Sequence, residues 1–227
     1  MADRRTRAPS WDPERQNVFN RAMKQLVKDP TAAVRSRSAL IADLIYGWAN
    51  PGWSALDEYL TACVRWAIRT RGPILECGAG LSTIVVGAIA KRRGLSLWSL
   101  EHAPDWIARV EVCLHHYRLD NVILCATVLQ DYGEFVWYDP PLEFMPDDFS
   151  LVICDGPPGS IKGGRYGLMP ILGERLRADC TVLLDDAGRR GELAIAERWN
   201  AELAMPFRIK GVAKPYIELT FSTALMK

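Results

Sequence analysis

The chain has 227 residues, of which 49% are hydrophobic, so it can bury a sizeable core as one domain of ordinary size with a smaller addition. Its 28 basic and 27 acidic side chains leave a formal net charge of +1, which excludes an overall positive field that would attract nucleic acid or anionic lipid. A small-molecule partner is expected instead. No apolar run approaches the about 20 residues that cross a bilayer, and the first residues lack the apolar core of a secretory signal, so we expect a cytoplasmic protein.

Residues 1–70 are predicted to form a helical extension, because apolar side chains recur there at helical spacing and prolines separate the segments. The expected helices are 12–28, 31–48 and 54–69. Ser54 is placed to cap the third of them. Trp48, Trp53 and Trp66 make the region aromatic, and they either pack against the main domain or belong to a lid over a substrate pocket. The extension could also be the face of a homodimer.

Residues 71–227 are predicted to form an α/β domain with a Rossmann-like, seven-stranded, mostly parallel sheet. Short runs rich in Val, Ile and Leu alternate with amphipathic stretches of helical length, which is typical of βαβ units. The strand-like runs are 73–77, 96–101, 121–126, 149–154 and 181–185. The helical stretches are 82–93, 104–118, 165–177 and 192–203. Two last runs, 207–213 and 216–223, are separated by a link too short for a crossover helix, so we expect an antiparallel hairpin at the sheet edge.

The first of these strands ends in an unusual corner, Glu76-Cys77-Gly78-Ala79-Gly80. Ligands of open parallel sheets bind beyond the carboxyl ends of the strands, and the glycines let a ligand lie against the backbone. A dinucleotide site would need a third glycine, but Thr83 stands at that position, and the Glu76 carboxylate would repel a pyrophosphate. The corner therefore suits a ligand without phosphates.

A second acid, Glu101, closes the next strand about twenty residues later, where a carboxylate can accept ribose hydroxyls. Together, the corner, this acid and the terminal hairpin resemble class I S-adenosylmethionine-dependent methyltransferases. The resemblance covers roughly residues 73–223. It implies that Glu76, Gly78 and Gly80 hold the amino acid part of the cofactor and that Glu101 holds its ribose. The full set expected to contact the cofactor is Glu76, Gly78, Gly80, Ser82, Thr83, Glu101, His102 and Asp155.

The adenine contacts are where this chain departs from the family. The family often has an acid or Asn just after the third strand, whereas this chain has Ala126 and Thr127. Asp131 and the aromatic pair Trp137 and Tyr138 could take over these contacts, or they could serve ordinary packing.

Three further acids are expected at the same edge of the sheet. Asp155 follows the fourth strand, and Asp185 and Asp186 follow the fifth, and neighbouring parallel strands lie about 5 Å apart. Three crowded carboxylates repel one another unless a cation lies between them. A hard divalent ion such as Mg²⁺, which prefers oxygen ligands, would resolve the repulsion and could lower the pKa of a bound hydroxyl.

These acids resemble the magnesium site of catechol-type O-methyltransferases, with Asp186 in place of an Asn. That family also has a lysine base soon after the first metal ligand, which Lys162 matches only loosely because the loop before it is longer. The pattern DGPPG, then RYG, then LLDDAGRR is closer to a broad group of bacterial methyltransferase-like domains. Arg165 could bind an acidic substrate or pair with Glu174.

The sequence thus predicts a class I methyltransferase that uses S-adenosylmethionine and acts on a hydroxyl of a small molecule, with Mg²⁺ as a further candidate cofactor. The candidate catalytic residues are Asp155, Lys162 and His102. Two alternatives stay open. An aminopropyl transferase has the same architecture, and a non-catalytic cofactor-binding domain could serve in assembly.

Overall fold

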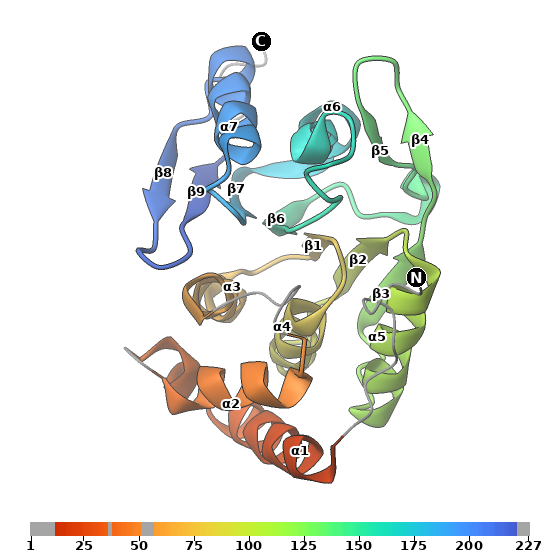
Figure 1. Cartoon of the computed structure of the whole chain (residues 1–227). Helices are drawn as coiled ribbons and strands as arrows, with labels where there is room; N and C mark the ends of the chain where they lie inside the picture. The colour runs from red at the N-terminus through yellow and green to blue at the C-terminus, as the bar shows by residue number, and fades with distance from the viewer. Residues whose placement is uncertain (1–11, 36–37, 51–56, 222–227) are drawn as a thin grey trace, which may run out of the picture.

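The computed structural model describes residues 12–35, 38–50 and 57–221. Its centre is a seven-stranded sheet with the order β3-β2-β1-β6-β7-β9-β8, covered by helices on both faces (Figure 1). Five strands are parallel, and β9 pairs antiparallel with both β7 and β8. The predicted α/β fold and its terminal hairpin are confirmed. In the part of the chain that the structure describes, no helix is long and apolar enough to cross a membrane.

The strands of this sheet are the apolar runs of the sequence. They are β1 (Ile74–Cys77), β2 (Leu97–Glu101), β3 (Val122–Ala126), β6 (Phe149–Cys154), β7 (Leu176–Leu184), β8 (Phe207–Lys210) and β9 (Tyr216–Thr220). Alternate side chains of the central strands face opposite layers, as the two-residue period of a strand requires. Ile74 of β1 packs toward one set of helices and Leu75 toward the other.

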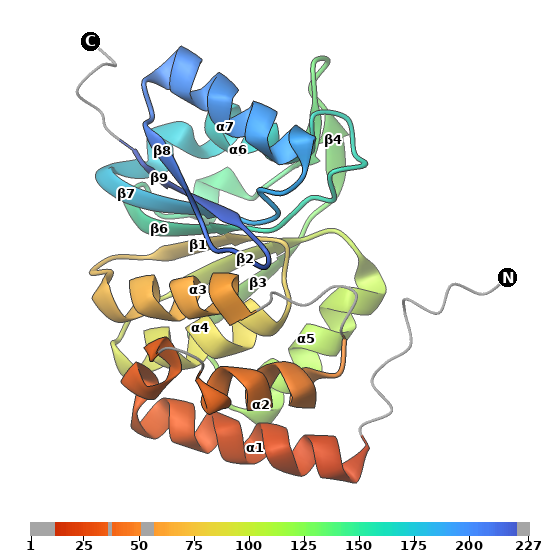
Figure 2. The ribbon, with the colours of Figure 1, turned by 60° about the vertical axis from the view of Figure 1, so that its left-hand side comes forward.

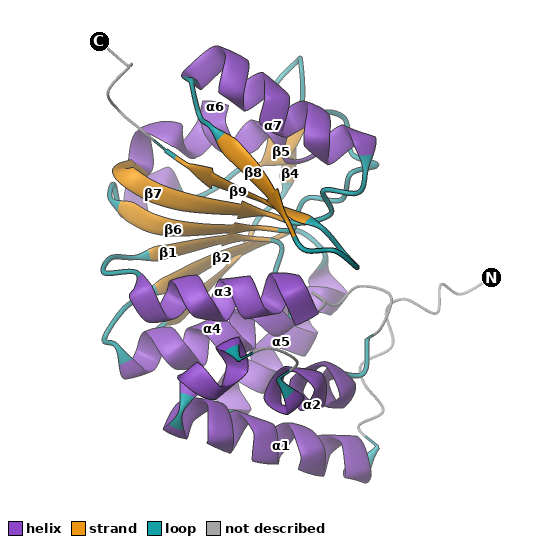
Figure 3. Ribbon diagram, turned by 90° about the vertical axis from the view of Figure 1, so that its left-hand side faces the viewer, coloured by secondary structure: helices purple, strands orange, loops and turns teal. Residues whose placement is uncertain are grey.

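One face of the sheet carries α3 (Asp57–Arg69), α4 (Leu81–Arg92) and α5 (Pro104–His116). The other face carries α6 (Leu168–Leu172) and α7 (Arg190–Leu203), together with a separate hairpin of β4 (Leu129–Asp131) and β5 (Val136–Tyr138) (Figures 1 and 3). The hairpin takes the place of a crossover helix between β3 and β6. It lies between the predicted strands 121–126 and 149–154, where the sequence pattern predicts neither a strand nor a helix.

The first helices form an additional layer outside α3 and α4, at the bottom of Figure 2. This layer consists of α1 (Pro13–Lys28), the 3-10 helix η1 (Pro30–Val34) and α2 (Ala39–Trp48). Phe19, Leu26 and Leu44 are fully buried in the same hydrophobic core as Ile74. The hydroxyl of Tyr59 in α3 donates to the Leu183 carbonyl, so α3 is fastened directly to the sheet.

Two predicted helices differ from the structure. Residues 31–48 are broken into η1 and α2, because Pro30 and the side chain of Asp29, which caps Thr31, favour a short 3-10 turn. The stretch 165–177 forms only 3-10 turns and the five-residue α6, and β7 already begins at Leu176. The short elements 142–144, 164–167 and 173–175 are 3-10 helices, η2 to η4. The predicted cap Ser54 and Trp53 lie outside the described residues.

Candidate functional site

Four neighbouring strands, β1, β2, β6 and β7, have their carboxyl ends at the same level of the sheet. Cys77 is in register with Leu100 on one side and with Cys154 on the other, and Cys154 is in register with Leu184. The residues that follow these positions therefore share one edge. This register brings the glycine corner, Glu101 and the acids after β6 and β7 together, as the sequence predicted.

Gly78 holds the corner close to the neighbouring loop. Its φ of +91° lies in the region that favours glycine, and a Cβ there would come within 2.8 Å of the Gly156 backbone nitrogen. The Cys77 carbonyl accepts hydrogen bonds from both Asp155 N–H and Gly156 N–H, at 2.9 and 2.7 Å. A Cβ at Gly156 would in turn meet the Tyr138 hydroxyl and Gly78. The corner after β1 and the loop after β6 are thus a single packed unit.

Glu76 is fully buried at the start of this corner. Its Oε2 accepts hydrogen bonds from the hydroxyls of Thr83 and Ser99, both at 2.6 Å, and the Thr83 Oγ1 also accepts from Gly80 N–H. Oε1 has no hydrogen-bond partner among the described residues. Burial raises the pKa of Glu76 to about 7, although the hydroxyls of Ser82, Ser99 and Thr83 oppose the shift. A ligand cation near Oε1 would satisfy this carboxylate.

Thr83 stands where a dinucleotide site would have its third glycine, and its hydroxyl is already used between Glu76 and Gly80. Its described contacts are therefore those of a residue that positions Glu76. Gly80 differs, because a Cβ built there would have only the Trp106 ring nearby, at 3.8 Å. The Trp106 indole donates to the Ala79 carbonyl, a contact that the sequence reasoning did not anticipate.

Glu101 is buried at the end of β2 and is largely engaged by backbone amides. Its Oε1 accepts from the N–H groups of His102 and Ala103, and its Oε2 accepts from Ala79 N–H at 3.0 Å. Since each carboxylate oxygen offers two lone pairs, Oε2 has room for one further donor. The His102 Nδ1 lies 3.1 Å from Oε1, and its side chain is 26% exposed. One ribose hydroxyl is therefore accommodated more readily than two.

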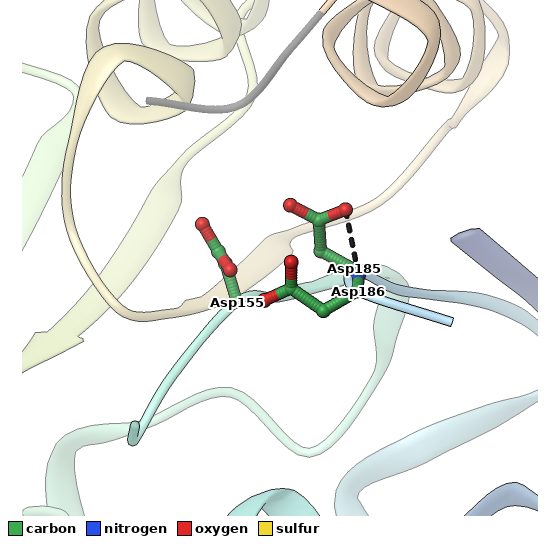
Figure 4. Close-up of side chains that lie close together, drawn as sticks. All are labelled: Asp155, Asp185 and Asp186. Carbon is green, nitrogen blue, oxygen red and sulfur yellow. Dashed lines mark hydrogen bonds between the residues drawn. The ribbon is translucent and has the colours of Figure 1, made fainter. Parts of the chain in front are cut away.

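Asp155, Asp185 and Asp186 converge as predicted, with one carboxylate oxygen of each within 4.8 Å of the others (Figure 4). Asp186 has a φ of +63°, in the left-handed region that Asp tolerates better than most residues. Its backbone N–H donates to the Asp185 Oδ1 at 2.7 Å, shown as the dashed line in Figure 4. The turn after β7 is thus shaped to present both acids.

Cationic side chains of the protein itself lie at these acids, a contact that the sequence did not predict. The buried Arg165 guanidinium donates to Asp155 Oδ1 and Asp186 Oδ2, both at 2.9 Å, and lies 3.4 Å from the Glu192 carboxylate. Lys214 Nζ lies 2.9 Å from Asp185 Oδ2 and 3.4 Å from Asp186 Oδ1. The predicted repulsion is therefore already offset by side chains of this protein.

The pKa shifts follow from this arrangement. Burial raises the pKa of Asp155 and of Asp185, against the opposing charges of Arg165 and Lys214. Because the Asp155 side chain is 27% exposed, solvent screening weakens its shift. Burial also acts to raise the pKa of Asp186, but the hydrogen bond and the charge of Arg165, together with the charges of Lys214 and Arg189, outweigh it and the pKa is lowered. Asp186 is thus the acid most firmly held in its charged form.

Several other expectations concern side chains that the structure places elsewhere. Lys162 is exposed, and its Nζ donates to the Gly133 carbonyl in the β4–β5 turn. Asp131 accepts from Gly133 N–H in the same turn and is also exposed. Arg165 pairs with Asp155, Asp186 and Glu192, so the alternative that it pairs with Glu174 is wrong.

Sequence reasoning missed the roles of Arg165 as a buried hub, of Glu192 beside it and of Lys214. Only the RYG motif pointed toward the first, and nothing local indicated that Glu192 contacts Arg165 or that Lys214 contacts Asp185, because these partners are distant in sequence.

Comparisons with solved structures identify the fold. The chain is similar to the precorrin-6Y C5,15-methyltransferase from Geobacter metallireducens (15% identity, TM-score 0.59), covering 77% of this chain and 92% of that one. It is similar to an O-methyltransferase from Bacillus cereus in complex with SAH (14%, 0.58, 95% and 100% covered). It is also similar to a ribosomal protein L11 methylase from Lactobacillus delbrueckii (19%, 0.50, 75% and 81%). No family model and no curated protein matches. The chain therefore has the fold of class I S-adenosylmethionine-dependent methyltransferases.

The close approach of Gly78 to Gly156 predicts that Gly78→Ala destabilises the protein beyond the effect of its φ alone. Gly94→Ala is a matched control, because Gly94 also has a positive φ (+68°) but has no atom within 4 Å of a built Cβ. We expect a loss of about 1 kcal/mol for the control and a further loss of about 1–3 kcal/mol at Gly78, since the backbone of Gly156 cannot move aside cheaply. Urea unfolding measures both losses, and equal values would contradict the packing described here.

The raised pKa of Glu76 predicts that its contribution to stability falls as the pH rises. A carboxyl whose pKa is higher in the folded state than in the unfolded state stabilises the fold below the unfolded value and loses that contribution on passing the folded value. The shift from 4.5 to about 7 corresponds to at most about 3 kcal/mol. From about pH 5 to about pH 8, Glu76→Gln should therefore gain stability relative to wild type by up to this amount.

Urea unfolding at the two pH values measures this change. Glu143→Gln, at an exposed position, is the control and should show no such gain. Parallel pH profiles for wild type and Glu76→Gln would show that Glu76 keeps an ordinary pKa in the folded protein.

Proposed function

We propose that this protein is a methyltransferase that binds S-adenosylmethionine at the corner after β1 and transfers its methyl group to an oxygen of a small molecule. The observation that carries the proposal is the buried Glu76 at the glycine corner, whose Oε1 accepts no hydrogen bond from the described residues. A carboxylate in this position suits a cationic group and disfavours a pyrophosphate. The fold comparisons support the same cofactor.

The residues present fit this cofactor. Glu76 would hold its ammonium group, Gly80 has no side chain of its own to keep it from the backbone, and Glu101 would accept a ribose hydroxyl. The cofactor supplies an activated methyl group on a sulfonium, so the protein must mainly align an acceptor and remove its proton. The net charge of +1 and the absence of an overall basic field favour a small acceptor.

We assign Asp155 as the base that removes the proton of the acceptor hydroxyl. It follows β6 beside Gly78, it is 27% exposed, and Arg165 binds its Oδ1 but not its Oδ2. His102 is the second candidate, because its ring lies beside Glu101 and is 26% exposed. The Mg²⁺ that the resemblance to catechol-type O-methyltransferases implies fits these acids less well, because Arg165 and Lys214 already bind their oxygens.

Binding of SAH to the full-length protein tests the cofactor assignment. Calorimetry should show one site in wild type, and Glu101→Ala should weaken it about 10- to 100-fold, because the variant loses the ribose acceptor and frees the Ala79 amide. Glu143→Gln should bind like wild type. Absence of SAH binding by the folded wild-type protein would rule out the proposed function.

Turnover tests the assignment of Asp155. A library of hydroxylated metabolites is screened with S-adenosylmethionine, and release of SAH is measured. With an accepted substrate, Asp155→Asn should lower kcat by about 10²- to 10⁴-fold while SAH affinity stays within about threefold of wild type. Unchanged kcat in Asp155→Asn would move the role to His102.

A further inference from the structure

The oxygens of the acid cluster, defined as Asp155, Asp185 and Asp186, are nearly all engaged by protein donors. Arg165 binds Asp155 Oδ1 and Asp186 Oδ2, Lys214 binds Asp185 Oδ2 and approaches Asp186 Oδ1, and Asp186 N–H binds Asp185 Oδ1. Of the six carboxylate oxygens, only Asp155 Oδ2 has no such donor among the described residues. A divalent cation that bound all three acids would lie beside the Lys214 ammonium and the Arg165 guanidinium, whose positive charges would repel it.

The charges of the cluster and its surroundings nearly balance. Glu192 adds a fourth carboxylate, and among the described residues the cations within 4 Å of these acids are Arg165, Arg189 and Lys214. Four negative and three positive charges leave one net negative charge. A dication would replace this small imbalance with a net positive charge in a region where Asp185 and Arg165 are almost fully buried.

Hydrogen bonds to the Glu58 carboxylate and to the Pro215 carbonyl hold the backbone around Lys214 in place, and we call this set of hydrogen bonds the clamp. The carboxylate of Glu58, in the first turn of α3, accepts hydrogen bonds from three successive N–H groups of the β8–β9 link, those of Val212, Ala213 and Lys214, at 2.8, 2.9 and 3.0 Å. The Pro215 carbonyl accepts from Ala187 N–H, next to Asp186. The backbone on both sides of the Lys214 side chain is thus fixed relative to the acids.

We infer that the ammonium group of Lys214, positioned by Glu58, serves as the built-in cation of the acid cluster, so that this protein works without a divalent metal ion. Lys214 neutralises Asp185 and Asp186, whereas Arg165 binds Asp155 and Asp186. Glu58 is a positioning residue, because it acts on the cluster only through the backbone of the link. The inference has a consequence for catalysis only if the proposed function is correct. Its test measures metal binding and does not require turnover.

Mn²⁺ binding to the full-length protein, followed by electron paramagnetic resonance, tests the inference. Wild type should bind no Mn²⁺ at the cluster at millimolar metal. Lys214→Ala frees Asp185 Oδ2 and Asp186 Oδ1 and leaves two net negative charges, so it should bind Mn²⁺ at least about 100-fold more tightly than wild type. Lys214→Arg keeps the charge and should behave like wild type, as should Lys24→Ala at an exposed position of α1.

Glu58→Gln tests the positioning role. Because the amide is a weaker acceptor for the three N–H groups, Lys214 should hold the acids less well, and Mn²⁺ binding should become measurable but weaker than in Lys214→Ala. Undetectable Mn²⁺ binding in Glu58→Gln, with clear binding in Lys214→Ala, would contradict the clamp.

Wild type and Asp185→Asn together decide the main point, even if Lys214→Ala does not fold. Mn²⁺ binding by wild type that is lost in Asp185→Asn would overturn the inference. SAH binding by wild type is measured separately, in the presence of a chelator. If SAH binds under these conditions, the proposed function stands whatever the Mn²⁺ result, whereas absence of SAH binding would mean that the proposed function itself fails.

Discussion

A single guanidinium, that of Arg165, joins the loops at the carboxyl ends of β6 and β7 to the start of α7. Its side chain is only 2% exposed, and it reaches Asp155, Asp186 and Glu192 as well as the carbonyls of residues 155 and 185. Burial alone would lower the pKa of Arg165, but Asp155 and the neighbouring acids reverse this and raise it. Removing a buried charge of either sign would leave the others uncompensated, so the geometry of this edge depends on the whole set.

The acid cluster and the glycine corner are parts of one structure, because the Cys77 carbonyl binds the N–H groups of both Asp155 and Gly156. Gly78 and Gly156 are packed too closely for a side chain to lie between them. The two loops also cannot separate without breaking these hydrogen bonds. A group bound at the corner therefore lies beside Asp155. Under the proposed function, this proximity would place the cofactor beside an acid, and it follows from backbone packing.

The sequence was sufficient for whatever depends on local pattern and on strand register. Alternation of apolar runs predicted the sheet, the short link around Lys214 predicted the hairpin, and the acids after the strands had to converge because parallel strands end together. It was not sufficient for contacts that cross the fold. Lys214 and Asp185 are 29 positions apart, and neither flanking segment indicates their pairing. The β4–β5 hairpin was missed because its strands have three residues each, too few for a visible alternation.

The N-terminal helical extension contacts the site through its helix α3. Tyr59 is hydrogen-bonded to the carbonyl of Leu183, two residues before Asp185, and its neighbour Glu58 binds the link that carries Lys214. Two successive residues of one helix thus brace both sides of the acid cluster, the strand that delivers Asp185 and the loop that neutralises it. A helix with this role must stay docked for the cluster to keep its charge balance. The described part of α3 is therefore a fixed support of the site, and any motion of a lid would have to come from other segments.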